Sequence, residues 1–198
     1  MNWDLFRAPA FWPLATSALG AGVVAALTNQ GIVWLKEARR TKAEHAREQR
    51  HVALTVAVVL ECYALECAQC ISDALDAEAE AGRTFSPDPL RSISMPTLTL
   101  PADTNWRWIP AELAARVLGL PLQVDYSRAY IRGASEYGDP FGSVAEIRTQ
   151  AARRGTEAWR LAELLRKAVH LPDSTLDTEP WDFRATLAEA LPKTKDAP

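Results

Sequence analysis

The first long pattern along the chain is an uncharged stretch that reads FWPLATSALGAGVVAALTNQGIVWL. Asp, Glu, Lys, Arg and His are all absent between Arg7 and Lys36. A helix that spans a bilayer needs about 20 consecutive apolar residues, so the length suffices for one crossing. Many positions are Ala, Gly, Ser or Thr, and Asn29–Gln30 adds two amides, so the hydropathy is moderate. We predict a single transmembrane helix over residues 11–35, after a short N-terminal tail over residues 1–10.

Both ends of this stretch carry residue types that favour a membrane interface. Trp12 and Trp34 would lie about 33 Å apart in a helix, close to a hydrocarbon core of about 30 Å. Basic residues follow at once, whereas the tail offers only Arg7 beside Asp4. The positive-inside rule then places the C-terminal side in the cytoplasm, and the lack of a eukaryotic targeting feature favours a bacterial inner membrane. The predicted interface residues are Trp12, Trp34, Lys36, Arg39 and Arg40.

Small residues recur every four positions within the predicted anchor. Small residues at this spacing let membrane helices approach closely, and an amide can hydrogen-bond across such a contact. Self-association of the anchor into a homo-oligomer is therefore one hypothesis; the alternative is that Ala and Gly are common in any helix. The residues involved would be Ala18, Gly22, Ala26 and Asn29.

The next pattern is a run without Pro or Gly from Lys36 to Ala81. We expect the anchor to continue into one long helix that stops at Gly82. Residues 36–51 are polar on every side, which predicts a basic juxtamembrane stalk. From Val52 the run is apolar almost all round, which is typical of a central helix covered by others.

Residues 52–171 carry the signals of a small cytoplasmic helical domain. A Pro-rich stretch over residues 82–109 predicts a long loop. Two helices are expected after it, over about residues 110–119 and 122–137, with Gly119 ending the first.

One apolar stripe over residues 143–170 predicts the clearest helix of this domain, a partner for the central helix. The stripe consists of Val144, Ile147, Ala151, Ala158, Leu161, Ala162, Leu165 and Val169. A C-terminal tail over residues 172–198 is expected to contain a short helix around residues 181–191.

These elements predict an all-α protein. Its N-terminal single transmembrane helix continues into a long helix that packs in a small cytoplasmic helical bundle. The alternative places the uncharged stretch inside a water-soluble bundle, as a buried helix.

Composition and charge narrow the class of partner. The chain has 198 residues, 48% of them hydrophobic and 24% charged, which argues against general disorder and against several membrane spans. The net charge of -3 gives the whole molecule no electrostatic preference for nucleic acid. The local basic run lacks interleaved aromatic residues, so anionic lipid headgroups or plain solvent are its expected neighbours.

The chain shows no pattern of catalytic or cofactor-binding residues. The cysteines, Cys62, Cys67 and Cys70, fall within one predicted helix, and the histidines are isolated. A CxxC spacing can mark redox or zinc chemistry, but no second ligand pair accompanies this one. We interpret the thiols as small buried core residues, and we predict no metal, no cofactor and no catalytic residue.

The most binding-like residues are Trp106, Arg107 and Trp108, at the end of the Pro-rich loop. Trp and Arg anchor many interfaces, although one or both Trp could instead cap the core. The sequence thus favours a membrane-anchored, non-enzymatic interaction or scaffold protein with a protein partner. Two alternatives are a membrane-perturbing effector of the toxin or phage-related kind and a soluble helical subunit of a larger assembly.

Overall fold

The computed structural model describes residues 11–137, 139–178 and 180–192. Side chains are described from Glu37 onward, except those of Ala38, Glu136, Tyr137, Asp177 and Thr178. The described chain is all-helical and contains no strand, as predicted. Its α-helices are α1 (Phe11–Thr84), α2 (Ala111–Tyr137), α3 (Pro140–Ala168) and α4 (Phe183–Glu189). Three short 3-10 helices complete it, η2 (Asp88–Ser92), η3 (Trp106–Trp108) and η4 (Thr175–Thr178).

The chain divides into two compact units, Met1–Arg47 and Glu48–Pro198. In the first unit the backbone of residues 11–47 is helical. The predicted anchor, its self-association residues and the interface residues Trp12, Trp34 and Lys36 have side chains outside the described residues. Arg39 and Arg40 are described and exposed, and the Arg40 Nε donates a hydrogen bond to Glu44 Oε1 at 2.9 Å.

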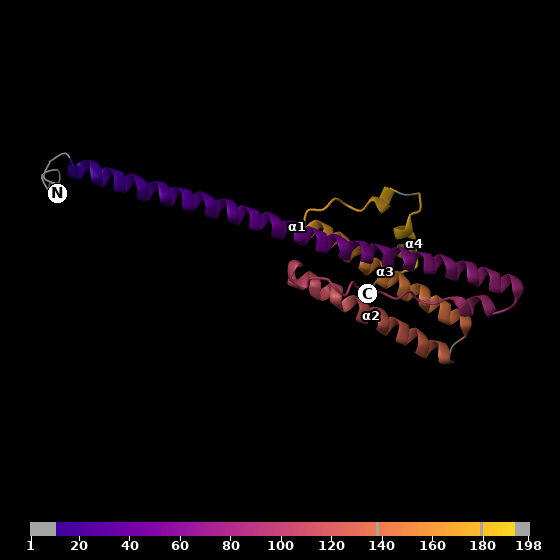
Figure 1. Ribbon diagram of the computed structural model, residues 1–198. Coiled ribbons are helices and arrows are strands. Elements are labelled where there is room, and N and C mark those ends of the chain that lie inside the picture. Colours follow the sequence, from indigo (N-terminus) through magenta and orange to yellow (C-terminus); the bar gives the residue numbers. More distant parts are fainter. Residues whose placement is uncertain (1–10, 138, 179, 193–198) are drawn as a thin grey trace, which may run out of the picture. The chain divides into compact units, whose positions relative to one another are not determined.

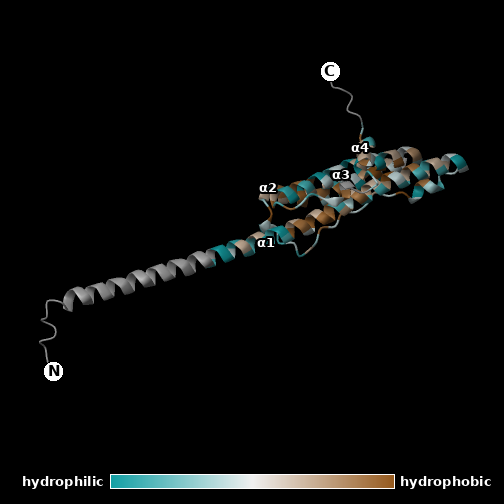
Figure 2. Ribbon diagram, turned by 90° about the horizontal axis from the view of Figure 1, so that it is seen from above, coloured by the Kyte–Doolittle hydropathy of each residue, from teal (hydrophilic) through white to brown (hydrophobic). Residues whose placement is uncertain are grey.

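One described helix is long and apolar enough to cross a membrane by length and composition. It is the segment Arg39–Thr84 of α1, and more than half of its most apolar stretch is buried in the structure. Figure 2 shows hydrophilic residues in the first part of this segment giving way to hydrophobic ones. This burial is also typical of the core helix of a soluble protein, so the segment is weak evidence for a crossing.

The helix α1 ends two residues later than predicted. Gly82 lies inside the helix, and nothing stands within 4 Å of the position a Cβ would take there. The turn comes instead at Phe85, whose φ of 52° is left-handed and whose side chain is 95% exposed. Pro87 follows, and Pro cannot continue a helix. The chain therefore leaves the helix through a Phe in a conformation that usually favours Gly.

The second unit is built on α2, α3 and the part of α1 from Glu48 onward. After α1 the chain runs back along the bundle, so that α2 runs parallel to α1 and α3 returns antiparallel to both (Figure 1). Ion pairs between Arg148 and Glu78 and between Arg166 and Glu61 show the same antiparallel order of α1 and α3.

This topology explains the long Pro-rich connection. A parallel neighbour requires the chain to travel the length of the bundle before α2 begins. The loop packs against the core along its length. Its buried residues are Leu90, Met95, Leu98 and Ile109. It is a covering segment of the core and more than a surface connector.

The helix α2 is continuous, and the prediction that Gly119 ends a first helix is wrong. Pro121 also lies within it, although Pro cannot donate to the carbonyl four residues earlier. On the core side, Val117, Leu120 and Val124 are completely buried. Burial of these three side chains outweighs the local helix-breaking signals, because it is available only if the helix continues.

The predicted stripe on α3 is buried at every one of its eight positions. The helix starts three residues earlier than predicted, at Pro140. Asp139 caps it by accepting hydrogen bonds from the backbone N–H of Phe141 at 2.7 Å and of Gly142 at 3.1 Å. An acidic N-cap followed by Pro is a strong helix start.

The expected short helix of the tail is α4, which packs on α3. The rings of Trp159 and Phe183 meet edge to face with centroids 5.0 Å apart. Phe183 and Leu187 are buried, so α4 closes one side of the core.

Candidate functional site

The side of α2 that faces away from the core is unusually apolar. Four large side chains spaced four residues apart lie there, with exposed fractions of 49% for Leu118, 74% for Leu122, 70% for Tyr126 and 50% for Tyr130. Single exposed hydrophobic residues are normal, whereas a contiguous row is typical of an interaction surface. We call this row, with the small residues among it, the outward face of α2.

Small residues separate the large ones on this face. Ala115, Ala129 and Gly133 are exposed, and no atom lies within 4 Å of a Cβ built at Gly119 or Gly133. Gly in the middle of a helix costs about 0.5–1 kcal/mol relative to Ala, so these glycines do not stabilise α2 itself. They do leave room for another backbone to approach closely.

Large and small residues on the outward face follow an order that is symmetric about Val124. Each large residue has a large counterpart at the same distance on the other side, and each small residue has a small one. The symmetric pairs are Leu122 with Tyr126, Gly119 with Ala129, Leu118 with Tyr130, and Ala115 with Gly133.

Polar contacts on the flanks hold α2 in place against α3. The Ser127 Oγ donates to Gln150 Oε1 at 2.9 Å and accepts from Arg154 Nε at 2.9 Å, while Arg154 Nη1 donates to Gln123 Oε1 at 2.7 Å. Arg116 pairs with Glu157 at 2.7 Å. These contacts fix which side of α2 remains outward.

The predicted binding residues lie together on η3, just before α2 in the chain. Trp106 is partly buried and packs against the core. The Arg107 guanidinium lies over the Trp108 ring, with its Cζ 4.6 Å from the ring centroid. Trp106 thus packs against the core, whereas Trp108 forms a cation–π pair with Arg107.

The interpretation of the cysteines holds for two of the three. Cys67 and Cys70 are buried, but Cys62 is exposed, because it lies about 140° from Cys67 around the helix. Burial raises the pKa of Cys67 to about 12 and that of Cys70 to about 11. The described residues contain no group of three His, Cys, Asp or Glu placed to hold a metal ion.

A buried ion pair inside the core was not predicted from the sequence. Arg166 Nε and Nη2 donate to the two carboxylate oxygens of Glu61 at 2.6 and 3.0 Å, and Arg166 Nη1 donates to the Pro172 carbonyl at 3.0 Å. The hydrogen bond with Glu61 raises the pKa of Arg166. The only local signal was a carboxylate interrupting an otherwise apolar run. The pair joins α1 to α3 within the core.

Comparison of the chain with protein-family models, with curated proteins and with solved structures finds no match.

Proposed function

We propose that this chain is a membrane-anchored, non-enzymatic interaction protein whose helical unit associates with a second copy of itself through the outward face of α2. The exposed row of Leu118, Leu122, Tyr126 and Tyr130 is the observation that carries the proposal. Burial of such a row removes apolar surface from water and stabilises a complex.

The symmetric order of the outward face favours a second copy as the occupant. A two-fold interface places residue i against j and j against i. In an antiparallel pair of α2 helices centred at Val124, Leu122 meets Tyr126 of the other copy, and Gly119 meets Ala129. Large residues then share one level and small residues another, so the backbones approach where the side chains are small.

The outward face is small for a stable interface. From Ala115 to Gly133 it extends about 27 Å along one helix, and a standard interface buries about 800 Å² on each partner. We therefore expect a weak, reversible pair in dilute solution. Confinement of both copies to one membrane would raise their effective concentration and the occupancy of the pair.

Membrane anchoring rests on the sequence. The uncharged stretch over residues 11–35 is long enough for one crossing, and basic residues follow it on one side. The resulting location of the helical unit is the cytoplasm.

Cysteine crosslinking tests the pair directly. Two tagged full-length chains, one with Leu118→Cys and one with Tyr130→Cys, are co-produced in a Cys62→Ser background. Oxidation should join the two different chains. It should not join two Leu118→Cys chains, because those positions would lie about 18 Å apart along the axis, beyond the roughly 7 Å limit for a disulfide.

A charge variant supplies the matched control for this experiment. Leu122→Glu with Tyr126→Glu places carboxylates against each other across the pair and should abolish crosslinking. Leu75→Glu changes an exposed Leu on α1, 46% exposed, and should leave crosslinking intact. Leu122→Cys chains that join to each other in place of the 118–130 pair would contradict the antiparallel arrangement.

Carbonate extraction of membranes tests the anchor. An integral chain stays in the pellet, whereas release into the supernatant would favour the soluble-subunit alternative. Loss of membrane potential on overproduction would instead favour the membrane-perturbing alternative.

A further inference from the structure

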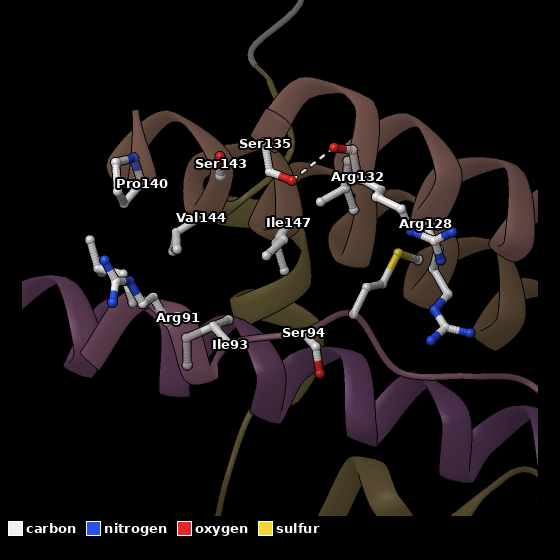
Figure 3. A pocket seen from close by; sticks show the side chains of 13 residues that line it. Arg91, Ile93, Ser94, Arg128, Arg132, Ser135, Pro140, Ser143, Val144 and Ile147 are labelled. Atoms are coloured by element: carbon white, nitrogen blue, oxygen red, sulfur yellow. Dashed lines mark hydrogen bonds between the residues drawn. The ribbon is translucent and has the colours of Figure 1, made fainter. Parts of the chain in front are cut away.

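A pocket of about 440 Å³ lies where η2 and the loop after it meet the end of α2 and the start of α3 (Figure 3). All of its lining residues belong to the second unit. Its floor is apolar: Leu90, Met95, Ile131, Val144 and Ile147 are buried, with exposed fractions of 9% or less. The volume is within the range of small-molecule sites in proteins, about 300–1,000 Å³.

Three arginines and no carboxylate line this pocket. Arg128 and Arg132 are one helical turn apart on α2, and Figure 3 shows both at one end of the pocket, with Arg91 at the other. Arg91 pairs with the exposed Asp88 at 3.3 Å. Within the described part of the chain, neither the Arg128 guanidinium nor the Arg132 guanidinium forms a hydrogen bond or an ion pair.

Two of the three serine hydroxyls that line the pocket are already engaged. Ser135 Oγ donates to the Arg132 carbonyl, and Ser143 Oγ donates to the Asp139 carbonyl. The nearby carboxylate of Asp139 accepts from two backbone N–H groups at the start of α3. The guanidinium groups of Arg128 and Arg132 therefore remain as the available charged donors at the pocket.

We propose that this pocket binds a small amphipathic anion that has one carboxylate or phosphate monoester head and an apolar body. Guanidinium groups bind such heads through paired, charge-assisted hydrogen bonds. The apolar body of the ligand would pack on the buried floor between Leu90 and Ile147. A purely ionic ligand would have no apolar part to contact this floor. The proposal is independent of self-association, because the pocket is lined by none of the residues of the outward face.

Arginine footprinting of the full-length chain tests the proposal. The protein is held in phosphatidylcholine nanodiscs and treated with phenylglyoxal, which modifies accessible guanidinium groups, and each arginine is followed by mass spectrometry. Octyl phosphate at ten times its dissociation constant should slow modification of Arg128 and Arg132 about tenfold, because only about a tenth of the sites stay free. Arg153 is exposed on α3 and outside the pocket, and its rate should not change.

Matched ligands separate the two parts of the claim. Octanol and inorganic phosphate should protect neither arginine. Equal protection by inorganic phosphate, or equal protection of Arg153, would overturn the proposal.

A further experiment with anionic lipid distinguishes a membrane lipid from a soluble ligand as the source of the head group. Protection in nanodiscs that contain phosphatidylglycerol, without octyl phosphate, would support the proposal with a membrane lipid as ligand. Protection by octyl phosphate alone would support it with a soluble ligand. No protection in either arm would overturn it.

A variant gives a second measurement. Arg128→Gln with Arg132→Gln should remove the calorimetric heat of octyl phosphate binding, measured against empty nanodiscs, while circular dichroism shows unchanged helix content. Arg153→Gln is the control and should retain the heat. Full binding by the double variant would rule out the assigned site.

Discussion

The ion pair between Glu61 and Arg166 joins two residues that are 105 positions apart in the chain. Both side chains are nearly buried, with 7% and 11% exposed, so each charge depends on the other for its solvation. The pair also holds the end of α3 to the chain beyond it through the Pro172 carbonyl. Removal of one partner leaves an uncompensated charge in the core. The resulting loss of folding free energy is far larger than the net stabilisation that the intact pair contributes.

Arg166→Met should therefore lower the free energy of unfolding by about 3–5 kcal/mol. Replacement of both residues, Glu61→Leu with Arg166→Met, should recover most of this loss, because no buried charge remains. The measurement is denaturant unfolding of the full-length protein in detergent, followed by Trp fluorescence. Arg40→Met breaks an exposed pair and should cost at most about 0.5 kcal/mol. Equal losses in the single and double variants would contradict this account.

The buried thiol of Cys67 makes stability depend on pH in the alkaline range. Its pKa is raised by burial to about 12 in the folded protein, against about 8.5 in an unfolded chain. The folded state keeps a proton that the unfolded state releases, so the stability is fully present below pH 8.5 and declines as the pH rises toward 12. Cys67 is expected to contribute a slope of about 1.4 kcal/mol per pH unit. The buried Cys70, whose pKa is raised to about 11, adds to the slope in the same direction.

Unfolding measured between pH 8 and pH 10.5 checks this slope. Cys67→Ala should be less stable at pH 8 but should lose stability less steeply than the parent chain. Cys62→Ala changes an exposed thiol and should show the parent slope. A parent slope that persists in Cys67→Ala would assign the alkaline loss to other groups.

Among the elements, α1, α3 and α4 meet at Gly155. A Cβ at this position would lie 2.8 Å from the Cys67 Cβ and 2.8 Å from the Leu187 Cδ2. The Leu187 side chain can rotate away, but the Cys67 Cβ moves only with α1. The close approach of α1 and α3 therefore requires Gly.

Gly155→Ala should destabilise the folded unit by about 1–3 kcal/mol, the typical cost of overpacking. The Ala gains about 0.5–1 kcal/mol of helix propensity, which offsets part of this cost. Gly82→Ala is the matched control: no atom stands within 4 Å of its Cβ position, so it should be neutral or stabilising. The two variants are compared by thermal unfolding, and a Gly155→Ala chain as stable as Gly82→Ala would refute the close contact.

The α elements differ in how far the sequence determines them. On α3, every position of the predicted apolar stripe is buried, because one face of a regular helix meets one core. The stripe did not include Ala152, Gly155 and Trp159, which are also buried. On α2, the local signal of Gly119 led to the wrong prediction of two helices. Burial of side chains in the tertiary structure decides whether α2 continues. The stabilisation from this burial cannot be predicted from neighbouring residues in the sequence.

The candidate sites were harder to predict than the fold. The outward face of α2 becomes visible only once Val117, Leu120 and Val124 are known to face the core, since Leu118 and Leu122 then have to face outward. The pocket lined by Arg128 joins η2 and the loop after it to the end of α2 and the start of α3, which lie much further along the chain. The exposure of Cys62 likewise depends on which side of α1 the other helices cover.

At the scale of the whole molecule, the proposed single crossing with basic residues after it would place the entire second unit on one side of the membrane. Cys62 is a native reporter of that side, because its thiol is exposed while those of Cys67 and Cys70 are buried. Buried thiols react slowly, and their raised pKa values keep them protonated at neutral pH.

A membrane-impermeant maleimide should therefore label the folded chain once, at Cys62, in inverted inner-membrane vesicles and leave it unlabelled in intact spheroplasts. Cys62→Ser should remove this labelling, and denaturation in detergent should expose Cys67 and Cys70 as an internal measure of the total chain. Labelling in spheroplasts with protection in inverted vesicles would reverse the orientation, because the positive-inside rule would then have failed for this anchor. Recovery of the labelled chain in the supernatant, apart from the vesicles, would mean that residues 11–35 do not hold the protein in lipid. The effective concentration that favours pairing of α2 would then be lost with the anchor.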